Sequence, residues 1–421
     1  MQVNSLSFDP DMRTKNIRRK HLEFLIFGLL TLAGMFGVAR SIFTQDVVWV
    51  SNGLGWDGSH YDRLLKLLTG DVSLREPAAF PFCGRVGTPW ILANIFLGRI
   101  DFYQFNLAIS AIFSTLFVIV TTPLWRGNIK SLTAALALPS FLLFSPIRFT
   151  SFYPAYMDPP FLLLLTVALF FVIKGRYQMA AIMCLIAIPF REAGFYLIPL
   201  CVGFAVNEAK LKLRAVVCGL AIWLVGFAVK SLMLQVGSCE YGSQVKTAVL
   251  MFCLLFSDPT RFLDCLAALA LTLGPLMFPK KEMPMGSQIS DGRLQHFSLV
   301  AVFYVGLLSI VGGGDVTRIF YSFMPLYAPI LISSFGRLDV RGFALACLGW
   351  LTTNQMLEKY AQPAAEWPNN DLTGFFAQFP DHAHPFVAMT ILGTWLILRA
   401  LYGLGGRFED GSMSGNLAQR E

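Results

Sequence analysis

Long apolar runs, separated by short polar connections, constrain the fold of this chain more than any other feature. Only 14% of its 421 residues are charged, whereas soluble domains carry about 25%. A helix crosses the bilayer core with about 20 apolar residues. The sequence therefore predicts an all-α, polytopic membrane bundle of about 12 transmembrane spans, several of them short or re-entrant. The runs cover residues 24–43, 103–125, 132–146, 159–173, 178–190, 193–206, 215–236, 260–278, 297–313, 317–335, 342–357 and 386–404.

Basic residues orient the predicted spans. If the short apolar stretch 88–98 is a surface helix rather than a crossing, segments such as 126–130 and 207–214 fall on the cytoplasmic side. Lys and Arg then outnumber Asp and Glu inside and are outnumbered outside, as the positive-inside rule requires. We therefore expect a multi-pass protein with both termini in the cytoplasm, and short loops favour the bacterial inner membrane. Lys230 is left within a span.

No internal repeat or long linker divides the chain, so we expect one membrane domain over residues 1–421. Basic residues precede the first run without a cleavage site after it, which indicates an uncleaved signal anchor. The main segments outside the spans are the cytoplasmic tails 1–21 and 405–421, the first external loop 44–102, which should carry surface helices, and the late external loop 358–385.

The eight cysteines show neither CxxC pairs nor metal-ligand spacing. Only Cys83 and Cys239 lie in expected external loops; their spacing does not favour a disulfide but leaves one open. The histidines of 381–384 fit an ordinary surface loop better than a metal site. We assign no metal ligands and no cofactor, although a divalent cation stays open. Despite the net charge of +7, no long basic run indicates a nucleic-acid partner.

The first external loop contains the most informative stretch, WDGSHY at 56–61. Residues 60–68 place their apolar side chains on one helical face, which is typical of a helix resting on a membrane surface. Asp57 falls near the start of that helix, where the helix dipole favours a carboxylate. It is either a capping residue or a catalytic carboxylate.

Ionisable residues also lie close to the membrane in later external connections. Such groups are costly there and tend to face partners or a water-filled space. Arg191 and Glu192 either contribute to a site or form an internal ion pair that ties helices together. Asp315 follows three glycines, whose backbone N–H groups could approach a phosphate, and a plain loop is the alternative. The residues concerned are Asp158, Arg191, Glu192, Asp315 and Arg318.

An enzyme acting outside the membrane needs a donor delivered by the lipid, because ATP and nucleotide-sugars are absent there. A polyprenyl-phosphate sugar meets that need. Its transfer requires a carboxylate to accept the proton of the acceptor hydroxyl and cations, best arginines, to hold the departing phosphate. Arg85 in the first external loop is one such cation.

Three stretches resemble the integral-membrane (GT-C-type) glycosyltransferases that use polyprenyl-phosphate sugars. WDGSHY at 56–61 is similar to the WDG-x-x-Y stretch of the phosphatidylinositol-glycan mannosyltransferase-like branch, and DPPFLLLL at 158–165 and FREAGFYLIP at 190–199 resemble later helices of bacterial members. The resemblance implies that Asp57 is the catalytic or metal-coordinating acid. We also expect His60 and Tyr61, in the same stretch, to bind substrate. The paired acid of several branches is absent beside Asp57.

The leading hypothesis is therefore a glycosyltransferase that moves a sugar to a glycan, lipid or protein acceptor outside the cytoplasm. A transporter or lipid flippase, and a glycan polymerase or ligase, are the alternatives. The hypothesis requires the acids and guanidinium groups to gather around one external pocket. Asp57 would be the general base; Arg85, Arg191 and Arg318 would hold the phosphate; Asp158, Glu192 and Asp315 would orient the sugar or a cation.

Overall fold

The computed structural model of the chain describes residues 56–70, 82–144, 158–209, 212–237, 239, 249, 252–253, 256–257, 259–278, 292–311, 320–361 and 389–403. Every regular element within these ranges is a helix, which confirms the predicted all-α class. Residues 46–421 form one compact unit, and residues 1–45 lie wholly outside the described ranges. A single membrane domain over 1–421 stays a prediction.

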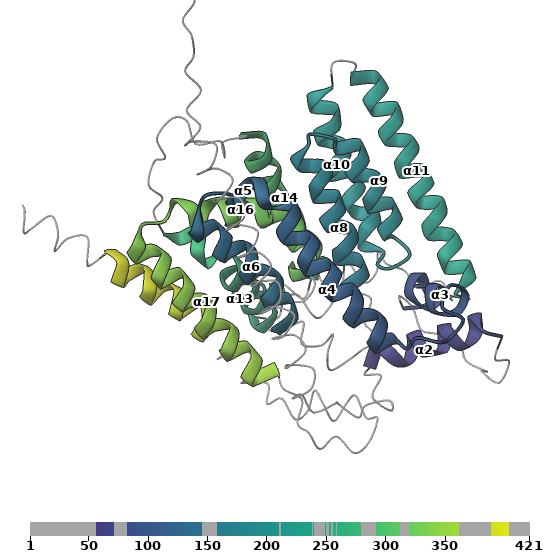
Figure 1. Cartoon of the computed structure of the whole chain (residues 1–421), viewed down its shortest axis with the longest axis horizontal. Coiled ribbons are helices and arrows are strands. Elements are labelled where there is room, and N and C mark those ends of the chain that lie inside the picture. Colours follow the sequence, from purple (N-terminus) through teal and green to yellow (C-terminus); the bar gives the residue numbers. More distant parts are fainter. Residues whose placement is uncertain are drawn as a thin grey trace, which may run out of the picture. The chain divides into compact units, whose positions relative to one another are not determined.

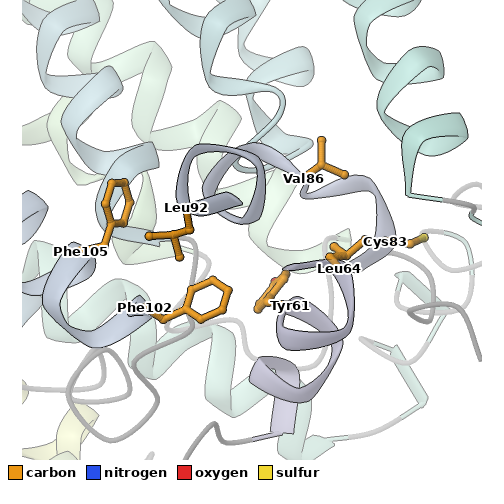
Figure 2. Close-up of a cluster of buried hydrophobic side chains, with 7 residues drawn as sticks. All are labelled: Tyr61, Leu64, Cys83, Val86, Leu92, Phe102 and Phe105. Atoms are coloured by element: carbon orange, nitrogen blue, oxygen red, sulfur yellow. The ribbon is translucent and has the colours of Figure 1, made fainter. Parts of the chain in front are cut away.

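The segment predicted as the first external loop forms helix α2 (Trp56–Leu68), the 3-10 turn η1 (Phe82–Gly84) and helix α3 (Gly87–Asn94). Tyr61 and Leu64 lie three residues apart on one face of α2 and are 0% and 1% exposed. They pack into an apolar cluster that Figure 2 shows. The cluster consists of Tyr61, Leu64, Cys83, Val86, Leu92, Phe102 and Phe105.

The helix predicted around 60–68 exists. Tyr61 and Leu64 of its apolar face are covered by protein, whereas Leu65 and Leu68 of the same face are partly exposed, so its placement on a membrane surface stays a prediction. Helix α3 has eight residues and is about 12 Å long, which is too short to cross a bilayer core. The stretch 88–98 is therefore not a helical crossing.

Five helices are arranged as successive neighbours (Figure 1): α4 (Phe102–Val120), α8 (Asp158–Ile173), α9 (Tyr177–Ala187), α10 (Ala193–Glu208) and α11 (Lys212–Val236). A three-residue turn, 174–176, joins α8 to α9, so these two helices run antiparallel. Asp158, the first residue of α8, consequently lies at the same end as the turn after α9. That turn contains Arg191 and Glu192.

Most residues of α16 are buried, and helices α5, α6 and α14 pack around it, whereas α13 and α17 contact η3 and each other. Helix α16 contacts α5, α6, α8 and α14, so it joins the second half of the chain to the first. These elements are α5 (Thr122–Trp125), α6 (Ile129–Phe144), α13 (Pro259–Leu273), η3 (Gly274–Met277), α14 (Gly292–Val311), α16 (Met324–Arg337), α17 (Val340–Ala361) and the helix Met389–Gly403.

Within the described part of the chain, α11 is the one helix long and apolar enough to span a membrane, judged by length and composition. Its 25 residues extend about 37 Å. Gly219 and Gly226 let it approach α10, because a Cβ at either position would contact Val202 or Ile198 of that helix. The other faces of α11 expose large apolar side chains such as Leu224, at 60%. This helix indicates membrane association.

Each apolar run predicted after residue 100 overlaps a helix of the structure. Most of these helices have fewer residues than a full crossing needs, so a bundle of twelve spans stays a prediction. The first run, 24–43, and most of the late loop 358–385 lie outside the described residues, as does the tail 405–421.

Candidate active site

Arg85 joins the first predicted external loop to the turn between α9 and α10. Its Nε and one terminal nitrogen each donate a hydrogen bond of 2.7 Å to a different carboxylate oxygen of Glu192. Its other terminal nitrogen donates to the hydroxyl of Tyr61 at 3.0 Å. The side chains of Arg85 and Glu192 are 10% and 25% exposed. A bidentate Arg–carboxylate pair fixes both distance and orientation, so this contact attaches the segment between η1 and α3 to the α9–α10 turn, and the hydrogen bond to Tyr61 adds α2.

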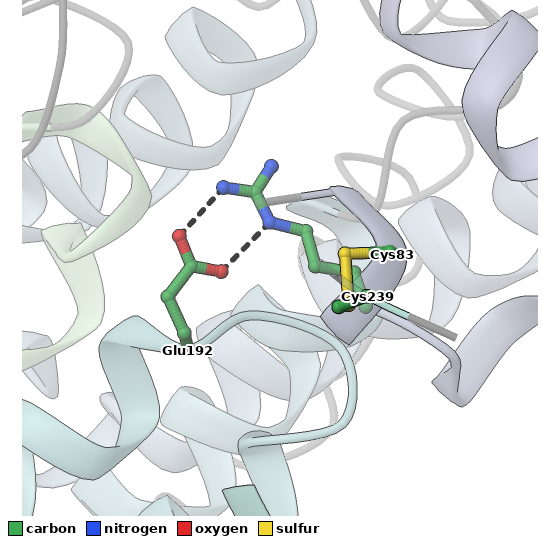
Figure 3. The surroundings of a disulfide bond; sticks show 4 residues. Cys83, Glu192 and Cys239 are labelled. Carbon is green, nitrogen blue, oxygen red and sulfur yellow. Dashed lines mark hydrogen bonds and ion pairs between the residues drawn. A yellow bond between two sulfur atoms is a disulfide. The ribbon is translucent and has the colours of Figure 1, made fainter. Parts of the chain in front are cut away.

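The backbone around Arg85 is fixed by two further contacts. Cys83 forms a disulfide with Cys239, just after the end of α11, with the Cα atoms 5.5 Å apart. The N–H of Gly87 donates to the carbonyl of Pro189 at 2.8 Å. Figure 3 shows the disulfide close to the two hydrogen bonds that Glu192 accepts. Arg85 therefore lies between two attachment points, each two residues away along the chain.

The disulfide also requires a close backbone approach. A Cβ added to Gly237 would collide with the carbonyl oxygen of Cys83. The spacing of 156 residues between the two cysteines gave no reason to expect their pairing, and only their predicted placement on the same side of the membrane pointed to it.

Arg191 forms a second, more deeply buried cluster. One of its terminal nitrogens donates to a carboxylate oxygen of Asp158 and to the hydroxyl of Ser322. Ser322 in turn donates to Asp158 at 3.3 Å. The guanidinium carbon lies 5.9 Å from the ring centre of Phe161. Because the Arg191 and Asp158 side chains are 8% and 2% exposed, this pair fits an internal tie between helices.

The two clusters are continuous through one peptide bond. Arg191 and Glu192 are consecutive, yet they pair with different partners rather than with each other. A path of direct contacts therefore runs from Tyr61 through Arg85 and Glu192 to Arg191, and on to the segment that begins α16. This path brings together side chains from three of the external connections between predicted spans.

Of the remaining predicted site residues, one lies next to these clusters and three have side chains outside the described part of the structure. His60 stacks on Phe82, with ring centres 4.8 Å apart, next to Tyr61. Asp57 lies in the first turn of α2, one helical turn before Tyr61, and its side chain is outside the described part of the structure. Asp315 and Arg318 also lie outside it; Ser322, four residues after Arg318, is described.

The Arg85–Glu192 pair strongly biases the ionisation of its members. Burial alone would raise the pKa of Glu192, but the charge and hydrogen bonds of Arg85, with a smaller effect of Arg191, lower this pKa to about 2. Burial lowers the pKa of Arg85, but its interactions with Glu192 and Tyr61 outweigh burial and raise the pKa. Both groups are charged at neutral pH, so a full positive charge faces the hydroxyl of Tyr61.

Two contributors to this region were not assigned roles from the sequence. No motif in the sequence around Ser322 marks it as a site residue. Lys230 carried one signal, since it is a charged residue inside a long apolar run, and its ammonium donates to the hydroxyl of Tyr196 at 3.2 Å. Tyr196 lies one helical turn after Glu192.

Among the residues that the structure describes, no group of three or more His, Cys, Asp or Glu could hold a metal ion. No protein-family model, curated protein or solved structure significantly matches this chain. The geometry and chemistry of the site therefore carry the functional argument.

Proposed function

We propose that this protein is a GT-C-type integral-membrane glycosyltransferase that transfers a sugar from a polyprenyl-phosphate carrier to an acceptor hydroxyl outside the cytoplasm. The observation that carries the proposal is the contact path from Tyr61 through Arg85 and Glu192 to Arg191. Clustered guanidinium groups suit a phosphate, and carboxylates beside them suit proton transfer and hydroxyl binding.

The disulfide supports placing this chemistry on the external side of the membrane. Disulfides persist in oxidising compartments and are rare in the cytosol. An external Cys83–Cys239 bond puts the end of α11 outside and its start, after the basic segment 207–214, inside. That orientation follows the positive-inside rule. It agrees with a multi-pass protein of the bacterial inner membrane, with both termini in the cytoplasm.

In the proposed reaction, the carboxylate of Asp57 takes the proton of the acceptor hydroxyl as the acceptor oxygen bonds to the anomeric carbon. The bond between that carbon and the phosphate oxygen breaks, and its electron pair leaves with the polyprenyl phosphate. Arg85 lies in the same predicted external loop as Asp57, so we assign it to the negative charge that develops on the departing phosphate. Arg191, held by Asp158 and Ser322, positions the turn that carries Glu192.

Replacement of Asp57 tests the proposal. Purified protein in nanodiscs is supplied with a panel of polyprenyl-phosphate hexoses and pentoses, and release of polyprenyl phosphate is measured by mass spectrometry. We expect Asp57→Asn to slow release at least about 100-fold, as loss of a general base does. Asp62→Asn is the matched control, because Asp62 lies on the same helix and forms an i,i+4 ion pair of 2.7 Å with Lys66, whose side chain is 48% exposed.

Release by Asp57→Asn at the wild-type rate would remove Asp57 from the mechanism. If the wild type releases polyprenyl phosphate from no member of the panel but carries a solute or lipid across the membrane of sealed vesicles, the transporter or flippase hypothesis replaces the enzyme.

A further inference from the structure

Thr88 carries a buried hydroxyl without a protein partner, next to the candidate site. It is the second residue of α3 and is 0% exposed. Its Oγ1 forms no hydrogen bond with any residue in the described part of the chain. A hydroxyl buried in this way costs stability unless an acceptor meets it. Because buried polar groups are nearly always paired, the exception at Thr88 indicates a partner from outside the chain.

The start of α3 is uncapped. Its N-cap residue is Val86, which has no side-chain acceptor and makes no capping hydrogen bond. The N–H of Gly87 donates to the carbonyl of Pro189, and Pro89 has no N–H. The N–H of Thr88 is therefore left without a partner among the described residues. A helix start with an unused N–H carries a partial positive charge and favours an anion.

Arg85 has unused hydrogen-bond donors three residues before Thr88. A guanidinium carries five N–H donors. Two donate to the carboxylate of Glu192 and one to the hydroxyl of Tyr61. The other two have no hydrogen-bond partner within the described ranges, although Arg85 is only 8% exposed. The ring of Phe82 lies 5.4 Å from the guanidinium carbon and offers no oxygen or nitrogen acceptor.

The unused donors of Arg85 and Thr88 lie on the side of α3 that faces α2. Arg85 donates to Tyr61 of α2, and Leu92 belongs to the same apolar cluster as Tyr61 (Figure 2). Thr88 lies between them at helical spacing, three residues after Arg85 and four before Leu92; the backbone at Val86 is already helical. A Cα–Cβ bond tilts toward the start of its helix, so the Thr88 side chain is directed back toward Arg85.

From this gathering of donors we propose that Thr88 and Arg85 bind the phosphate of the lipid carrier at the start of α3. The inference rests on the proposed function, since it assigns the phosphate of the polyprenyl donor, and of its product, to these groups. One phosphate oxygen accepts from the guanidinium of Arg85, and another accepts from the hydroxyl and N–H of Thr88.

The surroundings of the two residues define how the phosphate is recognised. Glu192 already balances the charge of Arg85, so the phosphate is recognised by its oxygen acceptors more than by its net charge. Thr88 and Arg85 are both buried, so the phosphate reaches them by displacing part of their cover.

Binding of polyprenyl phosphate, without any sugar, tests the inference. The wild type and its variants are placed in phosphatidylcholine nanodiscs, and the bound carrier is counted by native mass spectrometry as polyprenyl phosphate is added. Thr88→Val keeps the shape of the side chain without its hydroxyl, and Thr88→Ser keeps the hydroxyl. We expect Thr88→Val to weaken binding about tenfold and Thr88→Ser to stay within about threefold of the wild type.

Thermal unfolding of the same proteins separates a binding role from a structural one. Thr88→Val removes an unpaired buried polar group, so its unfolding temperature should equal or exceed that of the wild type. A lower unfolding temperature would assign the hydroxyl to the fold and overturn the inference, as would wild-type binding by this variant. If Thr88→Val does not fold, Thr88→Ala and Thr88→Ser, which differ only in the hydroxyl, are compared, and equal binding by these two would overturn the inference.

Thr166→Val is the matched control. Thr166 is also 0% exposed, but its hydroxyl donates to the carbonyl of Leu162 within α8 at 2.9 Å. We expect this variant to bind like the wild type. An equal loss of binding in Thr166→Val would show that removal of any buried threonine hydroxyl has this effect, and would contradict the inference.

Two competitors identify the source of the phosphate. Inorganic phosphate or phosphatidylglycerol that displaces the carrier at equal concentration would contradict a site for a polyprenyl carrier, and failure of both to compete supports it. Thr88-dependent binding without sugar release would support the inference while contradicting the proposed enzyme. Sugar release together with unchanged binding in Thr88→Val would do the reverse.

Discussion

Glu192→Gln should remove a pH-dependent part of the protein's stability. In the folded protein the pKa of Glu192 is lowered from its usual 4.5 to about 2. A carboxyl whose pKa is lower in the folded than in the unfolded state stabilises the fold above its unfolded pKa. That stability is lost as the pH falls through the folded pKa. For Glu192 the window therefore extends from about pH 4.5 down to about pH 2.

The pKa difference sets the size of the effect. It corresponds to about 3 kcal/mol of unfolding free energy, and this is an upper value because the Glu192 side chain is 25% exposed. In a chain of 421 residues, such a change lowers the unfolding temperature at pH 7 by at most about 3–4 °C. Glutamine has nearly the shape of glutamate but is neutral, so it does not compensate the positive charge of Arg85.

The assay follows thermal unfolding of wild type and Glu192→Gln in detergent from pH 7 to about pH 2.5, by tryptophan fluorescence. Other carboxyl groups titrate in the same range, so the informative quantity is the difference between the two proteins. It should be largest at pH 7 and shrink as the pH falls. Asp62→Asn breaks an i,i+4 pair whose side chains are 25% and 48% exposed and which is worth about 0.5 kcal/mol or less, so this variant should follow the wild type closely. A difference that does not change with pH would refute the reasoning.

Three further perturbations test the framework around the site. Cys83→Ser removes the disulfide and should cost about 2–5 kcal/mol of stability, so its unfolding temperature should match that of the reduced wild type. Gly194→Ala places a Cβ 2.5 Å from the carbonyl oxygen of Cys184 and should sharply reduce the yield of folded protein. Gly203→Ala in the same helix, with nothing within 4 Å, should not. Arg85→Lys keeps the charge but loses the bidentate fork, so sugar release should fall at least about tenfold; wild-type release would exclude Arg85 from phosphate binding.

The sequence predicted helices well because their signal is local. Apolar runs such as 159–173 and 215–236 are long enough to identify a helix without knowledge of its neighbours, and α8 and α11 coincide with them closely. The face of α2 was predicted less well. Its pattern shows that Tyr61 and Leu64 avoid water, but the same pattern serves a membrane surface and a protein core.

Pairing of the site residues could be predicted only in part. Arg191 and Glu192 were recognised as costly charges needing partners, and both have partners in the structure. Which partner each takes depends on how α8, α9 and α10 pack, and no local pattern records that. Arg85 lies 107 positions from Glu192, and Ser322 lies 131 positions from Arg191. The roles assigned to Asp57, Asp315 and Arg318 stay predictions.

At the turn between α9 and α10, two consecutive residues with opposite charges pair with different parts of the chain. Arg191 is fixed to α8 and Glu192 to Arg85, so a small rotation of this turn strains both attachments together. Substitutions on the two sides should therefore be energetically coupled, and the double variant Asp158→Asn/Arg85→Met should differ in stability from the sum of its parts. A change that separates Arg85 from Glu192 should therefore also alter the packing at the first turn of α8, through Arg191 and Asp158.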